Sequence, residues 1–421
     1  MQLCYITSCN KPVPMKRFFS LFLVVLSFSA FGQNELLIRY PAVNNNGSLV
    51  SFSYQGDIWT VPATGGKATR LTIHEAYESN PVFSPDGSHI AFSGSRYGNN
   101  DIFVIPAEGG SPKRLTYHSG NDMISSWGGT GDILFSTTRE FQQIERPSEV
   151  YSISAKGGTE SRLLDAVGYD PIQSPDGRFI AITRGDINPI QREAYRGASN
   201  RDIWLFDTKT KTYTKITAYE TNDMLPRWGD SRTLYFLSTN SGRNNLYKLK
   251  IDDSGKVVGS PEQLTDYQDH SIRYFSISGD GKTIVFERGK EVTLFKTDTK
   301  ATQKVNIIIS TDMRFDPELN KSVSGDASGY LVSPNGKLLA LEIRGEVYVK
   351  EINKEKNSTN NVSDHPYRDM NAAWASDSIL LFTSDRADEN FDIYMVKSTD
   401  KKELNIFKSL KHQITRITKT A

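Results

Sequence analysis

The sequence predicts an all-β protein, a β-propeller built from four-stranded blades. One unit of about 47 residues recurs along the chain. Within each unit apolar and polar residues alternate with a period of two, and Pro, Asp and Gly bound the alternating runs. Four short strands in a unit of about 45 residues are the proportions of a propeller blade, whereas a β-helix would need a shorter period.

The overall composition excludes several classes of protein. The 421 residues are 37% hydrophobic, 24% charged and 11% aromatic, which excludes a disordered, collagen-like or coiled-coil chain. The formal net charge of +1 provides no basic field to attract nucleic acid or anionic lipid. Because no apolar run reaches about 18 residues, a polytopic membrane protein is also excluded.

The N-terminal segment has the three-part pattern of a secretory signal peptide. Two basic residues follow Met15, an apolar stretch covers residues 18–31, and small residues precede Gln33. We therefore expect residues 1–32 to be cleaved near Gly32–Gln33, which places the mature protein in the periplasm or outside the cell, with no membrane contact after cleavage. An uncleaved anchor is the alternative, and Met15 is an alternative start.

Both cysteines of the chain, Cys4 and Cys9, lie in this removable segment. The mature chain then has no disulfide framework and no cysteine chemistry.

The clearest copy of the repeating unit runs from Asn80 to Thr116. The turn SPDG at residues 84–87 is followed by the alternating runs HIAFSG and DIFVIP, a Gly-Gly hairpin and the closing run KRLT. Proline at the second turn position presets φ, and glycine at the fourth tolerates a positive φ. The unit therefore predicts four antiparallel strands from contiguous sequence, with ring closure by apolar packing between blades and not by a strand borrowed from the other end.

Three markers of this unit recur eight times. The turns begin at Val43, Phe83, Trp127, Gln173, Trp228, Ile277, Val332 and Trp374. The third-strand runs begin at Asp57, Asp101, Glu149, Asp202, Asn245, Glu291, Glu346 and Asp392. The closing runs, of the RLT type, begin at Arg70, Arg114, Arg162, Lys215, Gln263, Lys304, Asn361 and Arg416.

Eight units permit either one eight-bladed ring or a six-bladed ring followed by two blades. A long stretch poor in strand alternation precedes the seventh turn and favours the second arrangement. We then expect a six-bladed propeller over residues 33–310, a linker over 311–329, and the first two blades of an incomplete second propeller over 330–421. Two blades alone leave sheet edges exposed, so on this interpretation the chain is the front part of a longer protein.

The motif search predicts no catalytic, cofactor-binding or metal-binding residue. The chain lacks a G-x-S-x-G nucleophile elbow. His118, Ser119 and Asp122 lie too close along one loop to form a catalytic triad. The HEAYE segment beginning at His74 has Glu78 where a zinc helix needs its second histidine.

Other conspicuous residues have structural interpretations. Gly65–Lys67 lacks the rest of a phosphate-binding loop and is interpreted as a hairpin tip. The acidic loop 385–392, with carboxylates at Asp385, Asp388, Glu389 and Asp392, could suit calcium but is interpreted as solvated. The aromatic residues at the turn positions, Phe83, Trp127, Trp228 and Trp374, are interpreted as packing residues inside the blades.

An insertion at residues 186–201 is the one segment that breaks the repeat. It carries Arg192, Glu193, Tyr195, Arg196 and Arg201, and we expect it to lie on one face of the propeller. Loops held by a rigid scaffold often carry recognition. Contact with another domain, a subunit or a peptide is one interpretation, and a tolerated insertion is the other.

The SPDG-centred units and the junction NIIISTDMRFDP…SGDASGYLVSPNGK resemble the N-terminal propellers of tricorn-type proteases, in particular their secreted bacterial homologues. The resemblance covers roughly residues 35–421. It implies a six-bladed propeller, a seven-bladed one, then a PDZ domain and a protease core that lie beyond this chain. TolB-like and prolyl-oligopeptidase-like propellers carry the same repeat turn, so the turn alone is weakly specific.

The resemblance implies that this chain is the propeller portion of an exported serine peptidase acting on oligopeptides. Its propellers would guide or gate peptide or protein substrates, and its partners would be the PDZ and protease domains of the same longer chain. Assembly into a homo-oligomer is left open, as is any catalysis by this chain itself. The alternative is a stand-alone periplasmic TolB-like protein-binding propeller without enzymatic activity, and a prolyl-oligopeptidase propeller without its hydrolase domain is a third possibility.

Overall fold

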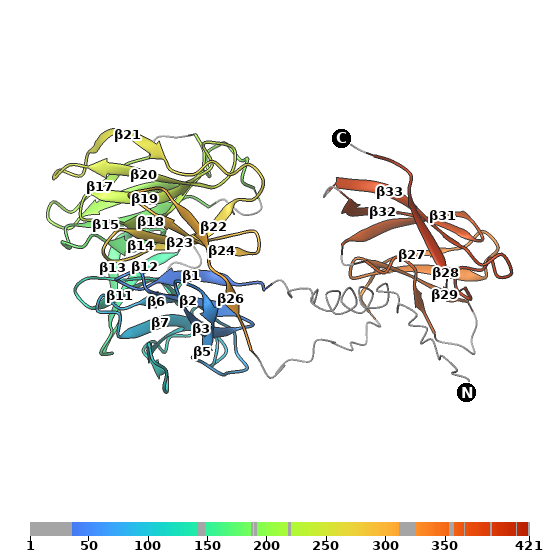
Figure 1. Cartoon of the computed structure of the whole chain (residues 1–421), viewed down its shortest axis with the longest axis horizontal. Helices are drawn as coiled ribbons and strands as arrows, with labels where there is room; N and C mark the ends of the chain where they lie inside the picture. The colour runs from blue at the N-terminus through green and yellow to red at the C-terminus, as the bar shows by residue number, and fades with distance from the viewer. Residues whose placement is uncertain are drawn as a thin grey trace, which may run out of the picture. The chain divides into compact units, whose positions relative to one another are not determined.

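The computed structural model describes residues 36–140, 148–186, 188, 192–217, 220–310, 325–352, 358–365, 367–387, 390–409 and 411–419. The expected signal peptide therefore lies outside the described residues. These residues form strands joined by turns and loops, in two compact units that divide between Thr311 and Asp312 (Figure 1). No helix among them is both long and apolar enough to span a bilayer.

The first unit contains six four-stranded antiparallel sheets, each formed by strands that follow one another in the sequence. The first sheet skips the short strand β4 (Gly66–Lys67), which pairs elsewhere. The first three are β1 (Arg39–Val43), β2 (Leu49–Tyr54), β3 (Asp57–Pro62) and β5 (Thr69–Arg70); β6 (Glu78–Phe83), β7 (His89–Gly94), β8 (Asp101–Pro106) and β9 (Lys113–Arg114); and β10 (Met123–Trp127), β11 (Asp132–Thr137), β12 (Glu149–Ser154) and β13 (Ser161–Val167). The next three are β14 (Tyr169–Gln173), β15 (Phe179–Arg184), β16 (Asp202–Asp207) and β17 (Thr212–Lys215); β18 (Asp223–Trp228), β19 (Thr233–Ser238), β20 (Asn245–Ile251) and β21 (Val257–Gln263); and β22 (Ile272–Ile277), β23 (Thr283–Arg288), β24 (Glu291–Lys296) and β25 (Thr302–Lys304).

The second unit contains two further four-stranded sheets. They are β27 (Ala327–Val332), β28 (Leu338–Ile343), β29 (Glu346–Glu351) and β30 (Asn360–Asn361), then β31 (Asp369–Ser376), β32 (Ile379–Ala387), β33 (Asn390–Ser398) and β34 (His412–Arg416). The prediction of an all-β protein with four-stranded propeller blades is confirmed. The first strand of seven of the eight sheets ends at the predicted turn position, and in the last sheet β31 runs two residues past Trp374.

The SPDG turns are held by side-chain hydrogen bonds that the sequence specifies. In the second sheet the Ser84 hydroxyl donates to the Asp86 carboxylate and accepts the backbone N–H of His89 at 2.9 Å. The same pattern recurs with Ser174 and Asp176 in the fourth sheet. Serine and aspartate are favoured in turns because their short side chains satisfy backbone groups locally.

The closing run explains why an acidic residue so often begins the third strand. The Asp101 carboxylate at the start of β8 pairs with Arg114 of β9 at 2.7 Å, and Asp57 pairs likewise with Arg70. The Thr116 hydroxyl accepts the backbone N–H of Ile102 at 2.9 Å. The D-I-x and R-L-T runs are thus two halves of one contact, which ties the outermost strand to its neighbour.

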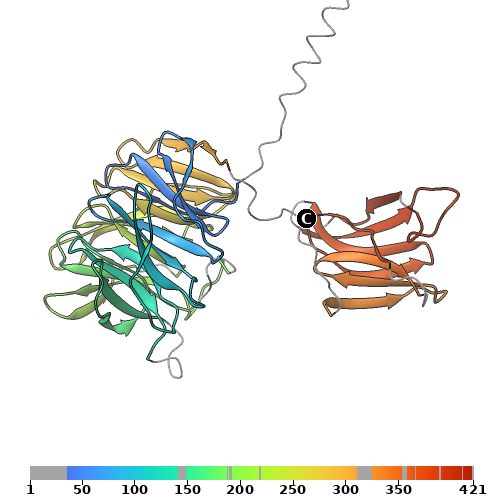
Figure 2. The ribbon, with the colours of Figure 1, turned by 90° about the horizontal axis from the view of Figure 1, so that it is seen from below.

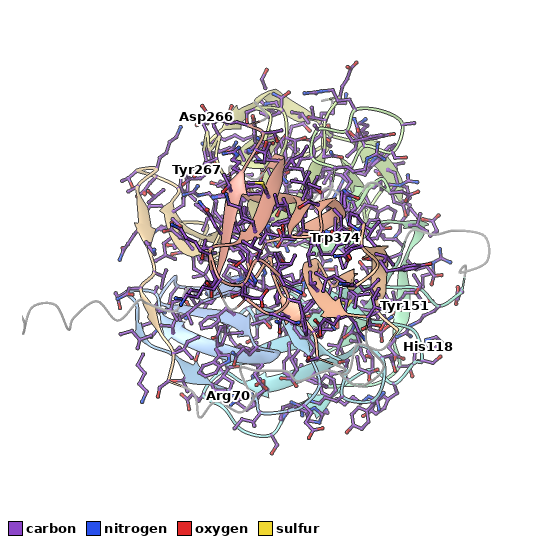
Figure 3. The ribbon with its side chains drawn as sticks, turned by 90° about the vertical axis from the view of Figure 1, so that its right-hand side faces the viewer. Arg70, His118, Tyr151, Asp266, Tyr267 and Trp374 are labelled. Carbon is purple, nitrogen blue, oxygen red and sulfur yellow. The ribbon has the colours of Figure 1, made fainter. Side chains whose placement is uncertain are left out.

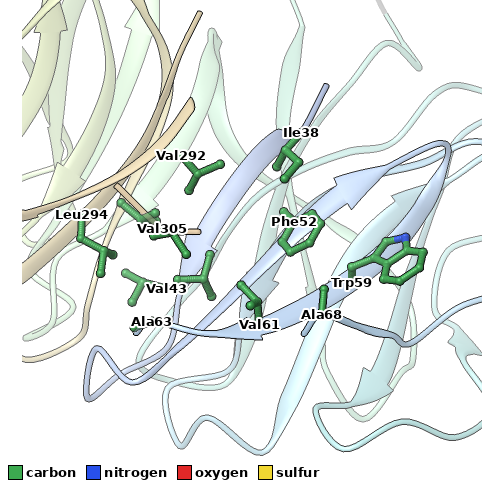
Figure 4. Close-up of a cluster of buried hydrophobic side chains, with 12 residues drawn as sticks. Ile38, Val43, Phe52, Trp59, Val61, Ala63, Ala68, Val292, Leu294 and Val305 are labelled. Carbon is green, nitrogen blue, oxygen red and sulfur yellow. The ribbon is translucent and has the colours of Figure 1, made fainter. Parts of the chain in front are cut away.

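Apolar clusters between neighbouring sheets close the first unit into a ring. One cluster joins the first two sheets, another joins the fifth and sixth, and the cluster in Figure 4 joins the sixth to the first. In that cluster Phe52 and Val61 of the first sheet pack with Val285 and Leu294 of the sixth. Figure 2 shows the orange sixth sheet beside the blue first one, so apolar packing closes the ring as predicted.

One detail of the predicted closure is wrong, because a strand from the far end of the ring also contributes. β26 (Ile307–Ile308) pairs in parallel with β4 (Gly66–Lys67) of the first sheet. The backbone N–H of Gly66 donates to the Asn306 carbonyl at 2.8 Å. Gly65–Lys67 lies at the predicted hairpin tip, where the Gly65 N–H donates to the Pro62 carbonyl, and it is in addition paired across the ring closure. Gly65 has φ +85°, and a Cβ there would lie 2.7 Å from the Asn306 carbonyl oxygen.

The second unit begins earlier than the sequence pattern indicates. Residues 311–324 of the expected linker lie outside the described residues, but its last three residues form the start of β27 at Ala327. Both Tyr330 and Val332 on this strand are exposed, so no alternation of buried residues marks it. Behind it, Val347, Val349, Leu380 and Phe382 form one apolar cluster across the two sheets of this unit.

Candidate functional site

A cavity of about 260 Å³ lies where the innermost strands of the six ring sheets meet. Its lining comes from β1, β6, β10, β14, β18 and β22 and from the turns that follow them. Because every sheet of the ring contributes, no local sequence motif could have predicted this site. The residues that line it are Ala42, Val43, Asn45, Pro81, Val82, Phe83, Ser84, Pro85, Ser125, Ser126, Trp127, Gly129, Ile172, Gln173, Pro175, Arg227, Trp228, Tyr274, Ser276, Ile277, Ser278 and Gly279.

A β-bulge interrupts each of these innermost strands shortly before the residues that reach the cavity. In four of them a residue with positive φ precedes a proline, as at Asn80–Pro81 in β6 and Leu225–Pro226 in β18. Proline cannot donate to a strand ladder, and a bulge leaves one residue unpaired, so the two features fit together. A bulge also bends the strand and re-aims the side chains that follow it.

The aromatic residues at the turn positions have two roles. Trp228 is 6% exposed and packs in the cluster between the fourth and fifth sheets, as predicted. Its indole N–H donates to the Ile172 carbonyl at 3.2 Å, on the preceding innermost strand. Phe83, Trp127 and Trp228 also line the cavity, a role that the sequence interpretation missed. In the second unit Trp374 likewise donates to the Leu331 carbonyl.

Arg227 is the one charged side chain among the described residues that line the cavity. It is 6% exposed, Nη1 donates to the Pro226 carbonyl at 2.8 Å, and Nη2 donates to the Tyr274 hydroxyl at 3.3 Å. Its guanidinium carbon lies 5.6 Å from the centre of the Tyr274 ring, which packs edge-on against Tyr40. The cavity therefore has aromatic walls, several hydroxyl groups and one positive charge.

Behind this wall, Glu287 lies at the seam between the sixth and first sheets. It is 4% exposed and accepts the backbone N–H of Tyr40 at 3.0 Å, with Arg39 at 3.4 Å from its other oxygen. Burial raises the pKa of Glu287 to about 7, against the opposing effect of Arg39. Burial also raises the pKa of the Tyr40 hydroxyl. These groups support the seam and do not line the cavity.

The residues of the rejected triad have other partners. His118 is exposed at the periphery of the ring, and its Nδ1 accepts the backbone N–H of Gly120 at 2.9 Å (Figure 3). The Asp122 carboxylate is buried and pairs with Arg139 at 2.6 Å. The described contacts of His118 and Asp122 are therefore with groups other than the Ser119 hydroxyl, and they do not form the nucleophile–base–acid arrangement of a triad.

The remaining acidic segments also have structural partners. In the HEAYE segment the buried Glu78 pairs with Arg96 at 2.6 Å, and burial raises the pKa of its carboxyl. In the acidic loop Asp392 pairs with Arg416, while Asp388 and Glu389 lie outside the described residues. Within the described part of the chain, no three His, Cys, Asp or Glu side chains are grouped to hold a metal ion.

The insertion at residues 186–201 folds against the neighbouring fifth sheet. Glu193 accepts a hydrogen bond from the Asn244 side chain at 2.7 Å and lies 3.6 Å from Arg243. The Arg201 guanidinium lies 4.8 Å from the centre of the Tyr169 ring. Arg192 covers Tyr195 of the same loop, and Arg196 is exposed. The described part of the insertion is thus anchored to the ring.

Comparisons with known proteins agree with the ring. Residues 35–301 match the family described as the tricorn protease N-terminal β-propeller domain. A tricorn protease homolog of Saccharolobus solfataricus is 27% identical over 316 residues, which is 74% of this chain and 28% of that relative. The chain therefore spans little more than a quarter of that relative's length. A Tol-Pal system protein TolB of Francisella tularensis is 26% identical over 270 residues, 60% of this chain and 58% of that protein.

Among solved structures, the crystal structure of the tricorn protease superposes with a TM-score of 0.58 at 19% sequence identity. The superposition covers 86% of this chain and 34% of that one. At this identity the likeness concerns the fold, which agrees with the ring of four-stranded sheets.

Proposed function

Because the chain belongs to the tricorn protease N-terminal β-propeller family, we propose that it is the propeller portion of an exported tricorn-like serine peptidase. On this proposal the first unit is the complete first propeller and the second unit begins the next one. The catalytic residues lie in domains outside these 421 residues, and the propellers guide or gate oligopeptides. The family match over residues 35–301 carries the proposal, and the cavity lined by all six ring sheets supplies a place for the peptide.

The gating role predicts that unstructured peptides bind this chain without being cleaved. The test is isothermal titration of short peptides into the purified chain, followed by mass spectrometry of the peptides. Ser125 lies in the cavity, so Ser125→Trp should fill the cavity and abolish binding. Ser111 is exposed on a loop, and Ser111→Trp is the matched control that should bind normally. Peptide hydrolysis by the chain alone would contradict the division of labour.

Export is a separate part of the proposal and rests on the N-terminal sequence pattern. N-terminal sequencing of the protein secreted by a bacterial host is expected to begin at Gln33. A product that retains residues 1–32 and sediments with membranes would favour an uncleaved anchor instead.

A stand-alone TolB-like protein-binding propeller is the second candidate, favoured by the match to more than half of a TolB protein. That function predicts binding of a folded protein partner to an outer face of the ring. Ser125→Trp would leave such binding intact, because the substitution fills the interior. The same variant thus separates the two functions.

A further inference from the structure

The charge of Arg227 is compensated differently from the charges of two partly buried arginines of the ring. Arg96 and Arg139 each pair with a buried carboxylate at 2.6 Å. Arg227 is buried, with 6% of its surface exposed, yet its described partners are a backbone carbonyl and the Tyr274 hydroxyl, both uncharged. A buried cation without an opposite charge is unfavourable unless something else solvates it.

The position of Arg227 indicates what solvates it. It follows the bulge and Pro226 in β18 and lines the central cavity, where no described lining residue is acidic. A guanidinium has five N–H donors in a fixed fork, and the two hydrogen bonds described above use one donor each from Nη1 and Nη2. The remaining donor capacity suits a planar anion such as a carboxylate, which arginine binds with charge-assisted hydrogen bonds.

The rest of the lining restricts the ligand. Trp127, Trp228 and Phe83 provide apolar walls, and Ser125 adds a hydroxyl group. Tyr274 holds the guanidinium by its hydroxyl and ring, and Tyr40 packs against that ring, so the arginine is preorganised. Such a lining suits a molecule with an apolar body and one carboxylate.

We propose that Arg227 is the carboxylate-binding residue of the central cavity and that its ligand is the free C-terminal carboxylate of a short peptide. This inference rests on the proposed peptide-guiding function and deepens it. A peptide carries a single C-terminal carboxylate, so the site would hold the peptide in one direction along the cavity. An acidic side chain has the same chemistry and is distinguished by experiment.

The test compares three peptides by isothermal titration into the full chain. The first is N-acetyl-Ala-Ala-Leu with a free carboxylate, the second is its C-terminal amide, and the third is N-acetyl-Ala-Glu-Leu amide. The free acid is expected to bind about tenfold to a hundredfold more tightly than its amide, because charge-assisted hydrogen bonds are lost in the amide. Equal binding of acid and amide would overturn the site while leaving the peptide-guiding proposal intact, and binding of none would refute the proposed function itself.

The variant Arg227→Met should bind acid and amide equally, and Arg227→Lys should retain only part of the preference, since lysine lacks the planar fork. Arg196→Met is the matched control, because Arg196 is exposed on the insertion and should not affect the preference. The wild-type comparison does not depend on any variant folding. Tight binding of the glutamate amide would keep the carboxylate site and overturn the assignment to the peptide C-terminus.

Discussion

Replacing Asp223 with asparagine is expected to stabilise the protein at pH 8 and to leave its stability nearly unchanged at pH 4. Asp223 begins β18 and is fully buried. In three other sheets the acidic residue at the equivalent position forms an ion pair with an arginine. That arginine follows, by two residues, the residue of the second strand that lies opposite the acidic residue. These pairs are Glu78 with Arg96, Asp122 with Arg139, and Asp369 with Arg386. In the fifth sheet Asn240 stands at the arginine position, so Asp223 lacks this partner.

The size of the effect follows from the carboxyl group's pKa. Burial raises the pKa of Asp223 from its ordinary value of 3.8 to about 7, and the hydroxyls of Ser238 and Thr217 oppose this only in part. At pH values between 3.8 and about 7, Asp223 is protonated in the folded protein but ionised in the unfolded chain. The free energy of unfolding therefore falls as the pH rises through this range. A shift of about 3 pKa units corresponds to a loss of up to about 4 kcal/mol above pH 7.

Urea unfolding followed by tryptophan fluorescence at pH 4 and pH 8 measures this effect, since four of the five tryptophans lie in the ring. Asp223→Asn should be more stable than the wild type by about 2–4 kcal/mol at pH 8 and by less than about 1 kcal/mol at pH 4. Asn240→Arg should stabilise at pH 8 as well, because it supplies the missing partner. Asp122→Asn is the opposite control, since it removes the buried carboxylate of Arg139 and leaves Glu160 at 3.6 Å as its remaining acidic neighbour, and it should cost about 3 kcal/mol. An Asp223→Asn variant with the same stability change at both pH values would refute the reasoning.

Two further substitutions test the closure and the repeat. Gly65→Ala should lower the free energy of unfolding by about 1–3 kcal/mol, because a Cβ at φ +85° would clash with the Asn306 carbonyl. Gly98→Ala is the control in the same urea titration: Gly98 has φ +99° but open space around it, so this variant reports the backbone strain without the clash. Thr72→Val should cost about 1–3 kcal/mol by leaving the buried N–H of Ile58 without its acceptor at 2.9 Å, and hydrogen exchange at Ile58 should accelerate. Unchanged exchange at that amide would show that the closing threonine does not cap the third strand.

The sequence predicts the strands well because their signals are local. The turn at Phe83 and the run beginning at Asp101 depend on residues within a few positions, so period-two alternation and turn chemistry suffice. The turn that ends β27 at Val332 is predicted, but the start of the strand at Ala327 is assigned to the linker, because its side chains are exposed and carry no such alternation. The ion pair between Asp101 and Arg114 can be inferred from the sequence only because the two motifs that contain these residues recur in several units.

The sequence by itself determined that this protein is a chain of four-stranded units with a propeller's proportions, since each unit folds from contiguous residues. Only the tertiary structure decided how the ring closes, where β26 meets Gly66 across more than two hundred residues. It also decided that Arg227 faces a cavity shared by six sheets and that Asp223 is buried without an arginine. These features depend on long-range packing and on bulges that shift the strand register, and neither is encoded in a local pattern.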